Sequence, residues 1–136
     1  MSNNSIVYLV VFLAFVALTA VAVAFLKSRN RNSDWQSKVT ERLAQIQSRK
    51  GLDPKLLVIE LDKLAEFALQ QKFNSKLSLG QILKEKKSKF SKKTLDEVWA
   101  GHKFRNNLVH EFNFKATPTE LGKASKQLKG FVQDLF

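Results

Sequence analysis

An apolar run near the N-terminus, IVYLVVFLAFVALTAVAVAFL at residues 6–26, constrains this chain most, because it contains no charged residue. As a helix rising about 1.5 Å per residue, the run reaches roughly 31 Å, which matches the hydrocarbon thickness of a bilayer. A helix that is apolar on every side does not fit the wall of a soluble bundle, which needs a polar outer face. The run therefore predicts a single transmembrane anchor over residues 1–26.

A cleaved signal peptide is the alternative, because Ala20-Val21-Ala22 resembles a cleavage site. However, the apolar run is longer than the core of such peptides, and residues 1–5 lack the positive charge that they carry. We therefore expect an uncleaved anchor. Since basic residues from Lys27 onward follow the span at once, the positive-inside rule predicts a cell-membrane protein with its N-terminus outside and its C-terminal part in the cytoplasm.

The charge of the chain is concentrated after this run. Lys and Arg number 23 against 12 Asp and Glu, which gives a net charge of +11, and all of these residues follow residue 26. Such a balance suits an anionic partner, meaning RNA, DNA or anionic lipid headgroups. There is no cysteine, which excludes disulfides, thiolate metal sites and thiol nucleophiles.

Residues 27–50 form the next segment, for which we expect a basic linker and an amphipathic stalk helix. Ser33 is the expected N-cap of a helix that runs to about Arg49. A thin apolar stripe at helical spacing follows the cap: Trp35, Val39, Leu43 and Ile46. The pattern leaves open whether this helix is a free stalk or docks on the domain that follows.

Residues 51–136 predict an all-α domain, an antiparallel four-helix bundle. Asp53-Pro54 is a cap followed by proline at the first helical position, and Ser78 with Gln81 forms a capping box, as does Thr117 with Glu120. Short loops between helices favour antiparallel neighbours, and no strand pattern competes. The helices are expected at about residues 54–73, 79–90 and 92–113, and from Pro118 to the C-terminus.

The helix at 92–113 carries the candidate site, within HKFRNNLVHEF at residues 102–112. On a helical wheel, Asn106 and His110 share a side with apolar residues, and Arg105 lies at its margin. Burying charged or hydrogen-bonding side chains without partners costs on the order of several kcal/mol of folding free energy. They must therefore pair with each other, with another subunit or with a ligand.

Arg105-Asn106-x-x-x-His110 resembles the signature of the HEPN superfamily (higher eukaryotes and prokaryotes nucleotide-binding). That signature is an arginine, a polar residue and then a histidine, late in a four-helix bundle. The resemblance covers the region from about Pro54 to Phe136 and leaves out the anchor and residues 27–50.

The resemblance implies a metal-independent endoribonuclease that dimerises to form a shared cleft, with no cofactor and no metal. Cleavage by the 2′-hydroxyl of RNA needs a group that moves protons near neutral pH, a role suited to His110. Arg105 offers a forked cation for the charge on phosphorus, and Asn106 a hydrogen bond that orients the phosphate or the imidazole. His102 is an auxiliary candidate, although a histidine at such a position is more often a core or interface residue.

The competing hypothesis is a structural polar network in a noncatalytic adaptor, which holds an unidentified protein partner at the membrane. Trp99 has the same two interpretations, packing or base stacking. A lysine-rich run adds a further candidate surface, which is either a solvated helix end, an RNA phosphate track or a membrane-surface patch. Its lysines are Lys84, Lys86, Lys87, Lys89, Lys92 and Lys93.

Overall fold

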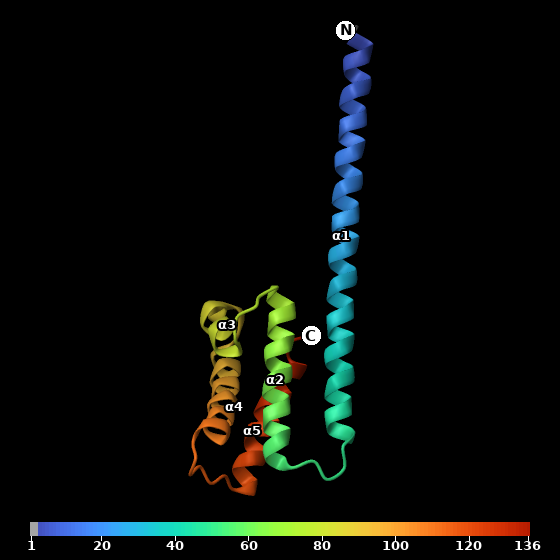
Figure 1. The fold of residues 1–136 in the computed structure, drawn as a ribbon. Coiled ribbons are helices and arrows are strands. Elements are labelled where there is room, and N and C mark those ends of the chain that lie inside the picture. Colours follow the sequence, from blue (N-terminus) through green and yellow to red (C-terminus); the bar gives the residue numbers. More distant parts are fainter. Residues whose placement is uncertain (1–2) are drawn as a thin grey trace. The chain divides into compact units, whose positions relative to one another are not determined.

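The computed structural model describes residues 3–136, with side chains except those of residues 3–4 and 28–33. The described residues contain helices and no strand, so the all-α prediction is confirmed (Figure 1). The chain divides into two compact units, residues up to Asp34 and residues Trp35–Phe136. The helices are α1 (Asn3–Ser48), α2 (Pro54–Phe73), α3 (Leu79–Glu85), the 3-10 helix η1 (Lys87–Lys89), α4 (Lys92–His110) and α5 (Pro118–Gln133).

The N-terminal unit is the first part of α1. Residues Ser5–Lys27 have a mean hydropathy of 2.9, and none of this segment is buried inside the protein. By length and composition the segment is able to cross a membrane, which agrees with the apolar run seen in the sequence.

The expected linker after the span is helical in the structure. α1 continues to Ser48, so Ser33, which was expected to cap a new helix, is an interior helical residue. The prediction of a separate linker and cap was wrong here, because residues 27–48 contain no proline or glycine that would interrupt the helix.

The second unit is built around three long helices. α5 packs against both α2 and α4, and α2 also contacts α4 and α3. In Figure 1, α2 and α5 run in one direction and α4 runs in the opposite direction. The side chains that fill the space between them include Val58, Leu61, Leu69, Leu83, Val98, Leu128 and Val132, each no more than 2% exposed.

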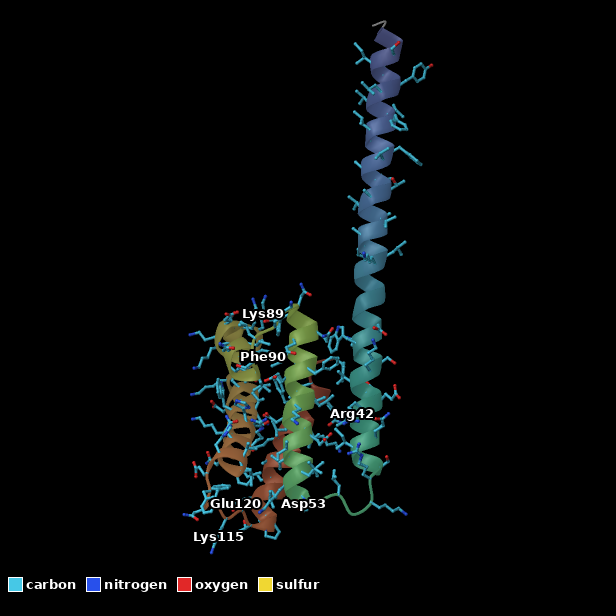
Figure 2. The ribbon with its side chains drawn as sticks, viewed as in Figure 1. Arg42, Asp53, Lys89, Phe90, Lys115 and Glu120 are labelled. Carbon is cyan, nitrogen blue, oxygen red and sulfur yellow. The ribbon has the colours of Figure 1, made fainter. Side chains whose placement is uncertain are left out.

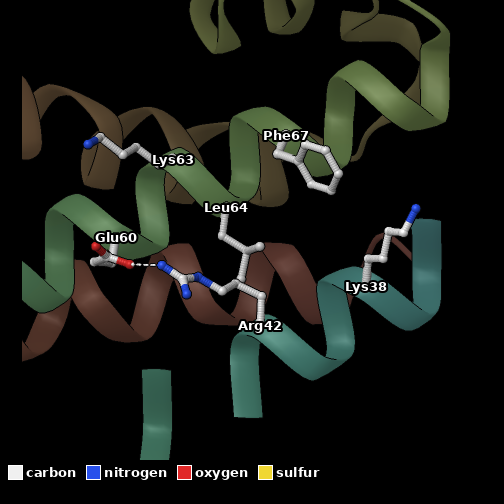
Figure 3. Close-up of a pocket in the computed structure, with 6 residues that line it drawn as sticks. All are labelled: Lys38, Arg42, Glu60, Lys63, Leu64 and Phe67. Atoms are coloured by element: carbon white, nitrogen blue, oxygen red, sulfur yellow. Dashed lines mark hydrogen bonds and ion pairs between the residues drawn. The ribbon is translucent and has the colours of Figure 1, made fainter. Parts of the chain in front are cut away.

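The C-terminal part of α1 belongs to this second unit. The stripe predicted from the sequence is buried, with Val39 fully inaccessible and Trp35 stacked on Phe136 at 5.7 Å between ring centroids. Arg42 also forms an ion pair with Glu60 of α2 at 2.9 Å (Figure 3). Because that pair is partly exposed, the apolar stripe supplies most of the stabilisation. This segment is therefore docked on the helical domain and is not a free stalk, two alternatives between which the sequence did not decide.

A turn at Lys86 and the 3-10 helix η1 replace the end of the expected third helix. α3 ends at Glu85 and not near residue 90, and α4 ends at His110 and not at residue 113. The turn brings the ring of Phe90 to 6.1 Å from Phe73 and 5.7 Å from Phe131, measured between centroids. Burial of this aromatic ring favours the turn over a longer α3.

The caps predicted at Asp53, Ser78 and Thr117 begin their helices as expected. The Asp53 carboxylate accepts a hydrogen bond from the backbone N–H of Lys55 at 2.7 Å (Figure 2). At the start of α5, Glu120 accepts from the backbone N–H and the hydroxyl of Thr117, both at 2.8 Å. These two bonds, the backbone one first, lower the pKa of Glu120 below its usual value.

Two glycines test how closely α4 and α5 pack. A Cβ on Gly101 of α4 would lie 2.8 Å from Cγ of Leu128 on α5, whereas a Cβ on Gly122 would meet nothing within 4 Å. We expect Gly101→Ala to lower the free energy of unfolding by about 1–3 kcal/mol through overpacking. Gly122→Ala should raise it by about 0.5–1 kcal/mol through helix propensity.

Urea unfolding of the two variants in detergent micelles, followed by circular dichroism, measures both effects. Equal stability of the two variants would contradict the close α4–α5 contact.

Candidate functional site

The residues of the sequence motif separate on α4. Arg105 and Asn106 are half-buried in the body of the helix, whereas His110 is its last residue and is exposed. Among the described residues, the His110 side chain has no hydrogen bond or ion pair. The structure therefore brings Arg105 and Asn106 together but leaves His110 apart from them.

Asp62 of α2 is the partner of the half-buried polar groups. It is 2% exposed and is the one buried charged residue among those described. Its Oδ1 lies 2.8 Å from Nδ1 of His102, and its Oδ2 lies 3.3 Å from Nε of Arg105. Arg105 Nε makes no hydrogen bond, so the second contact is an ion pair only.

Asn106 closes the arrangement from the other side. Arg105 donates from Nη1 to Oδ1 of Asn106 at 2.9 Å, and the Asn106 Nδ2 lies 3.3 Å from Nε2 of His102. The four side chains Asp62, His102, Arg105 and Asn106 thus form a closed circuit of contacts between α2 and α4, which we call the polar ring.

The polar ring assigns the tautomer of His102. A carboxylate only accepts hydrogen bonds, so the proton of a neutral imidazole belongs on Nδ1, which faces Asp62. Nε2 then carries a lone pair and accepts the N–H of the Asn106 amide. This one assignment satisfies both nitrogens of His102, while the Arg105 guanidinium balances the buried charge of Asp62.

One edge of the Arg105 guanidinium stays open. The side chain is 21% exposed, and its Nη2 has no hydrogen-bond partner among the described side chains. A guanidinium held at Nε and Nη1 presents its remaining N–H groups in a fixed direction, which suits an oxyanion such as phosphate.

Sequence reasoning missed Asp62, although a signal for it was present. Asp62 lies four residues after Val58 and three before Ala65, both of which are fully buried, so it shares their face of α2. An acid on the buried face of a helix requires a charged or hydrogen-bonding partner. The basic residues of α4 were the available partners.

His102 has a larger part in the site than the sequence indicated. It was an auxiliary candidate, yet in the structure it joins Asp62 to Asn106, and its ring meets Trp99 edge-on at 5.9 Å between centroids.

Trp99 also lines a groove between α3 and α4. It has a volume of about 680 Å³ and is lined by Lys84, Asp96, Trp99, Ala100 and Lys103. Both lysines are exposed and Trp99 is half-buried, so two cations and an aromatic ring line the same groove.

The lysine-rich run only partly reaches this groove. Lys84 lines it, while Lys86 lies over the ring of Phe73 at 6.0 Å. Lys92 begins α4 and His110 ends it, so the two are separated by about 27 Å along the helix axis. The other lysines of the run, Lys87, Lys89 and Lys93, are exposed, and Lys89 is labelled in Figure 2.

No group of three or more metal-ligating side chains comes together in the described part of the chain. Comparisons with protein-family models, with curated protein sequences and with solved structures gave no match to this chain. The geometry of the site therefore carries the functional argument.

The polar ring predicts that the packing of α2 against α4 depends on Asp62. Asp62→Ala removes the acceptor of His102 and leaves the Arg105 guanidinium half-buried without its counter-ion, so we expect a loss of about 3 kcal/mol in the free energy of unfolding. Glu97→Ala removes an exposed carboxylate from α4 and should change stability by less than about 0.5 kcal/mol.

Chemical denaturation of both variants in micelles checks the difference. If the two variants unfold at the same urea concentration, the ring does not hold these helices together.

Proposed function

We propose that this chain is a single-pass membrane protein whose helical domain is HEPN-like and binds RNA. Residues 6–26 form the anchor in the lipid bilayer, the N-terminus lies outside the cell membrane, and the domain lies in the cytoplasm. The apolar span and the basic residues that follow it support this arrangement.

The groove at Trp99 is the observation that carries RNA binding. Single-stranded nucleic acid is bound by aromatic side chains that stack on bases, flanked by cations that contact phosphates. Lys84 and Lys103 line the same groove as Trp99. The net charge of +11 adds long-range attraction for a polyanion.

RNA binding predicts a defined effect of the groove lysines. Lys84→Gln with Lys103→Gln should weaken binding of a single-stranded RNA by roughly tenfold at low salt, and should reduce the slope of log K against log salt by about 1.4. The matched control, Lys55→Gln with Lys115→Gln, removes two exposed charges outside the groove. Fluorescence anisotropy in a salt series measures both quantities.

Equal losses in the two double variants would show that only overall charge matters and would remove the groove from the proposal. Flotation with anionic and neutral liposomes, performed on the same variants, separates RNA binding from a purely lipid-binding role of the lysine-rich run.

Metal-independent cleavage of the bound RNA is the second candidate function. It is favoured by the open guanidinium edge of Arg105, which is able to stabilise charge on phosphorus, with Asn106 holding that guanidinium in place. The sequence motif predicts His110 as the proton-transfer group, but His110 is the exposed last residue of α4 and lies apart from Arg105 and Asn106.

A homodimer belongs to the same proposal. Beside His110, Val109 is 47% exposed and Phe112 is fully exposed, so apolar surface is present where a second motif helix would approach.

Cleavage predicts activity in the presence of EDTA. The full chain in micelles should cleave labelled RNA without added metal, and Arg105→Lys should lower the rate by about 10²-fold or more, because lysine lacks the forked contact. Denaturing gels of 5′-labelled RNA give the rates, and circular dichroism shows whether the variant is folded.

Binding without any cleavage across salt and pH would leave the RNA-binding proposal and remove the nuclease. A chain that neither binds nor cleaves RNA would instead favour the noncatalytic adaptor, in which the polar ring is purely structural.

A further inference from the structure

We propose that His102, positioned by Asp62, is the general base of RNA cleavage, in place of His110. This inference rests on the ribonuclease function proposed above and assigns its proton acceptor. It comes from the contacts of the polar ring, since the sequence motif points to the other histidine.

The orientation of its imidazole favours His102 as the base. Asp62 is buried and holds Nδ1 of His102 at 2.8 Å, which fixes the ring and places the lone pair on Nε2. A carboxylate in this position also stabilises the imidazolium that forms when Nε2 takes a proton. His110 has no such partner among the described residues, so nothing fixes its tautomer or its ring.

The surroundings of Nε2 also favour His102. Its one hydrogen-bond partner is the Asn106 amide at 3.3 Å, a long contact that a hydroxyl group is able to replace. Facing it on α3 is Gly80, where a Cβ would come within 3.6 Å of Nε2 and 3.3 Å of Cη2 of Trp99. Because glycine has no side chain, Nε2 is less covered than it would be with any other residue at this position.

His102 is also the histidine that lies close to the Arg105 cation. His102 and Arg105 contact the same carboxylate of Asp62, at 2.8 and 3.3 Å, so the imidazole and the guanidinium are close together. His110 lies five residues beyond Arg105, which places it about 140° around the helix and about 7.5 Å further along the axis. The polar ring therefore pairs the cation with His102.

The proposed step balances without a metal. Nε2 of His102 takes the proton of the 2′-hydroxyl, the 2′-oxygen forms a bond to phosphorus, and the bond between phosphorus and O5′ breaks. O5′ takes a proton from water, and the proton on His102 returns to solvent. The products are a 2′,3′-cyclic phosphate and a 5′-hydroxyl, and Arg105 neutralises the charge on phosphorus.

The two histidines supply the test, using the full chain in micelles and a labelled single-stranded RNA with EDTA present. His102→Ala should lower the cleavage rate by about 10²-fold or more, leave RNA affinity within threefold and regain activity with added imidazole. His110→Ala removes the competing histidine and should keep its rate within threefold. If His102→Ala is unfolded, His102→Gln, which retains an N–H for Asp62, replaces it with the same expected loss.

Asp62→Asn tests the positioning role. It should lower kcat by about tenfold with little change in KM, and ¹⁵N NMR of His102 should show a loss of the Nδ1–H tautomer preference. A substrate with a 2′-deoxy sugar at the cleavage site should not be cut.

Loss of cleavage in His110→Ala with full activity in His102→Ala would overturn this inference and leave the ribonuclease proposal intact. A chain that binds RNA but never cleaves it would overturn both, and RNA binding alone would remain.

Discussion

The buried carboxylate of Asp62 is the interaction on which the rest of the domain's polar chemistry depends. A charge this far from solvent is stable only with compensating partners, and α4 supplies them as an imidazole and a guanidinium on the same helical face. Each partner is in turn held by Asn106. One acid on α2 thereby fixes the tautomer of His102, the direction of Arg105 and the register of α4 against α2.

The packing of the domain brings these groups to the required distance. Gly101, next to His102 in sequence, allows α4 to approach Leu128 of α5, while Phe90 anchors the start of α4 through its contacts with Phe73 and Phe131. α4 is thus held by apolar contacts on one side and by the polar ring on another. A rigid helix of this kind suits a site that must present a cation and a proton acceptor in fixed positions.

The same ring has a structural and a chemical interpretation, and the two are compatible. Arg105 uses Nε and Nη1 within the protein but keeps Nη2 open, and His102 uses Nδ1 but meets only a long contact at Nε2. Lys84 and Lys103 line a separate groove at Trp99. A polyanion entering that groove would meet an aromatic ring and two ammonium groups, which is why RNA is the ligand that we favour.

The sequence by itself determined the elements that depend on local chemistry: the apolar helix, the all-helical content, and the caps at Asp53 and Thr117. It also predicted the stripe through Val39, because helical periodicity marks a buried face. Only the tertiary structure decided that this stripe is docked and that α3 stops at Glu85. It also decided that His102, and not His110, shares the partners Asp62 and Asn106 with Arg105. Those outcomes depend on contacts between distant parts of the chain, such as that of Asp62 with His102, which lies 40 residues away in sequence. Helical periodicity assigns a residue to a face but does not identify which residue of another helix will meet it.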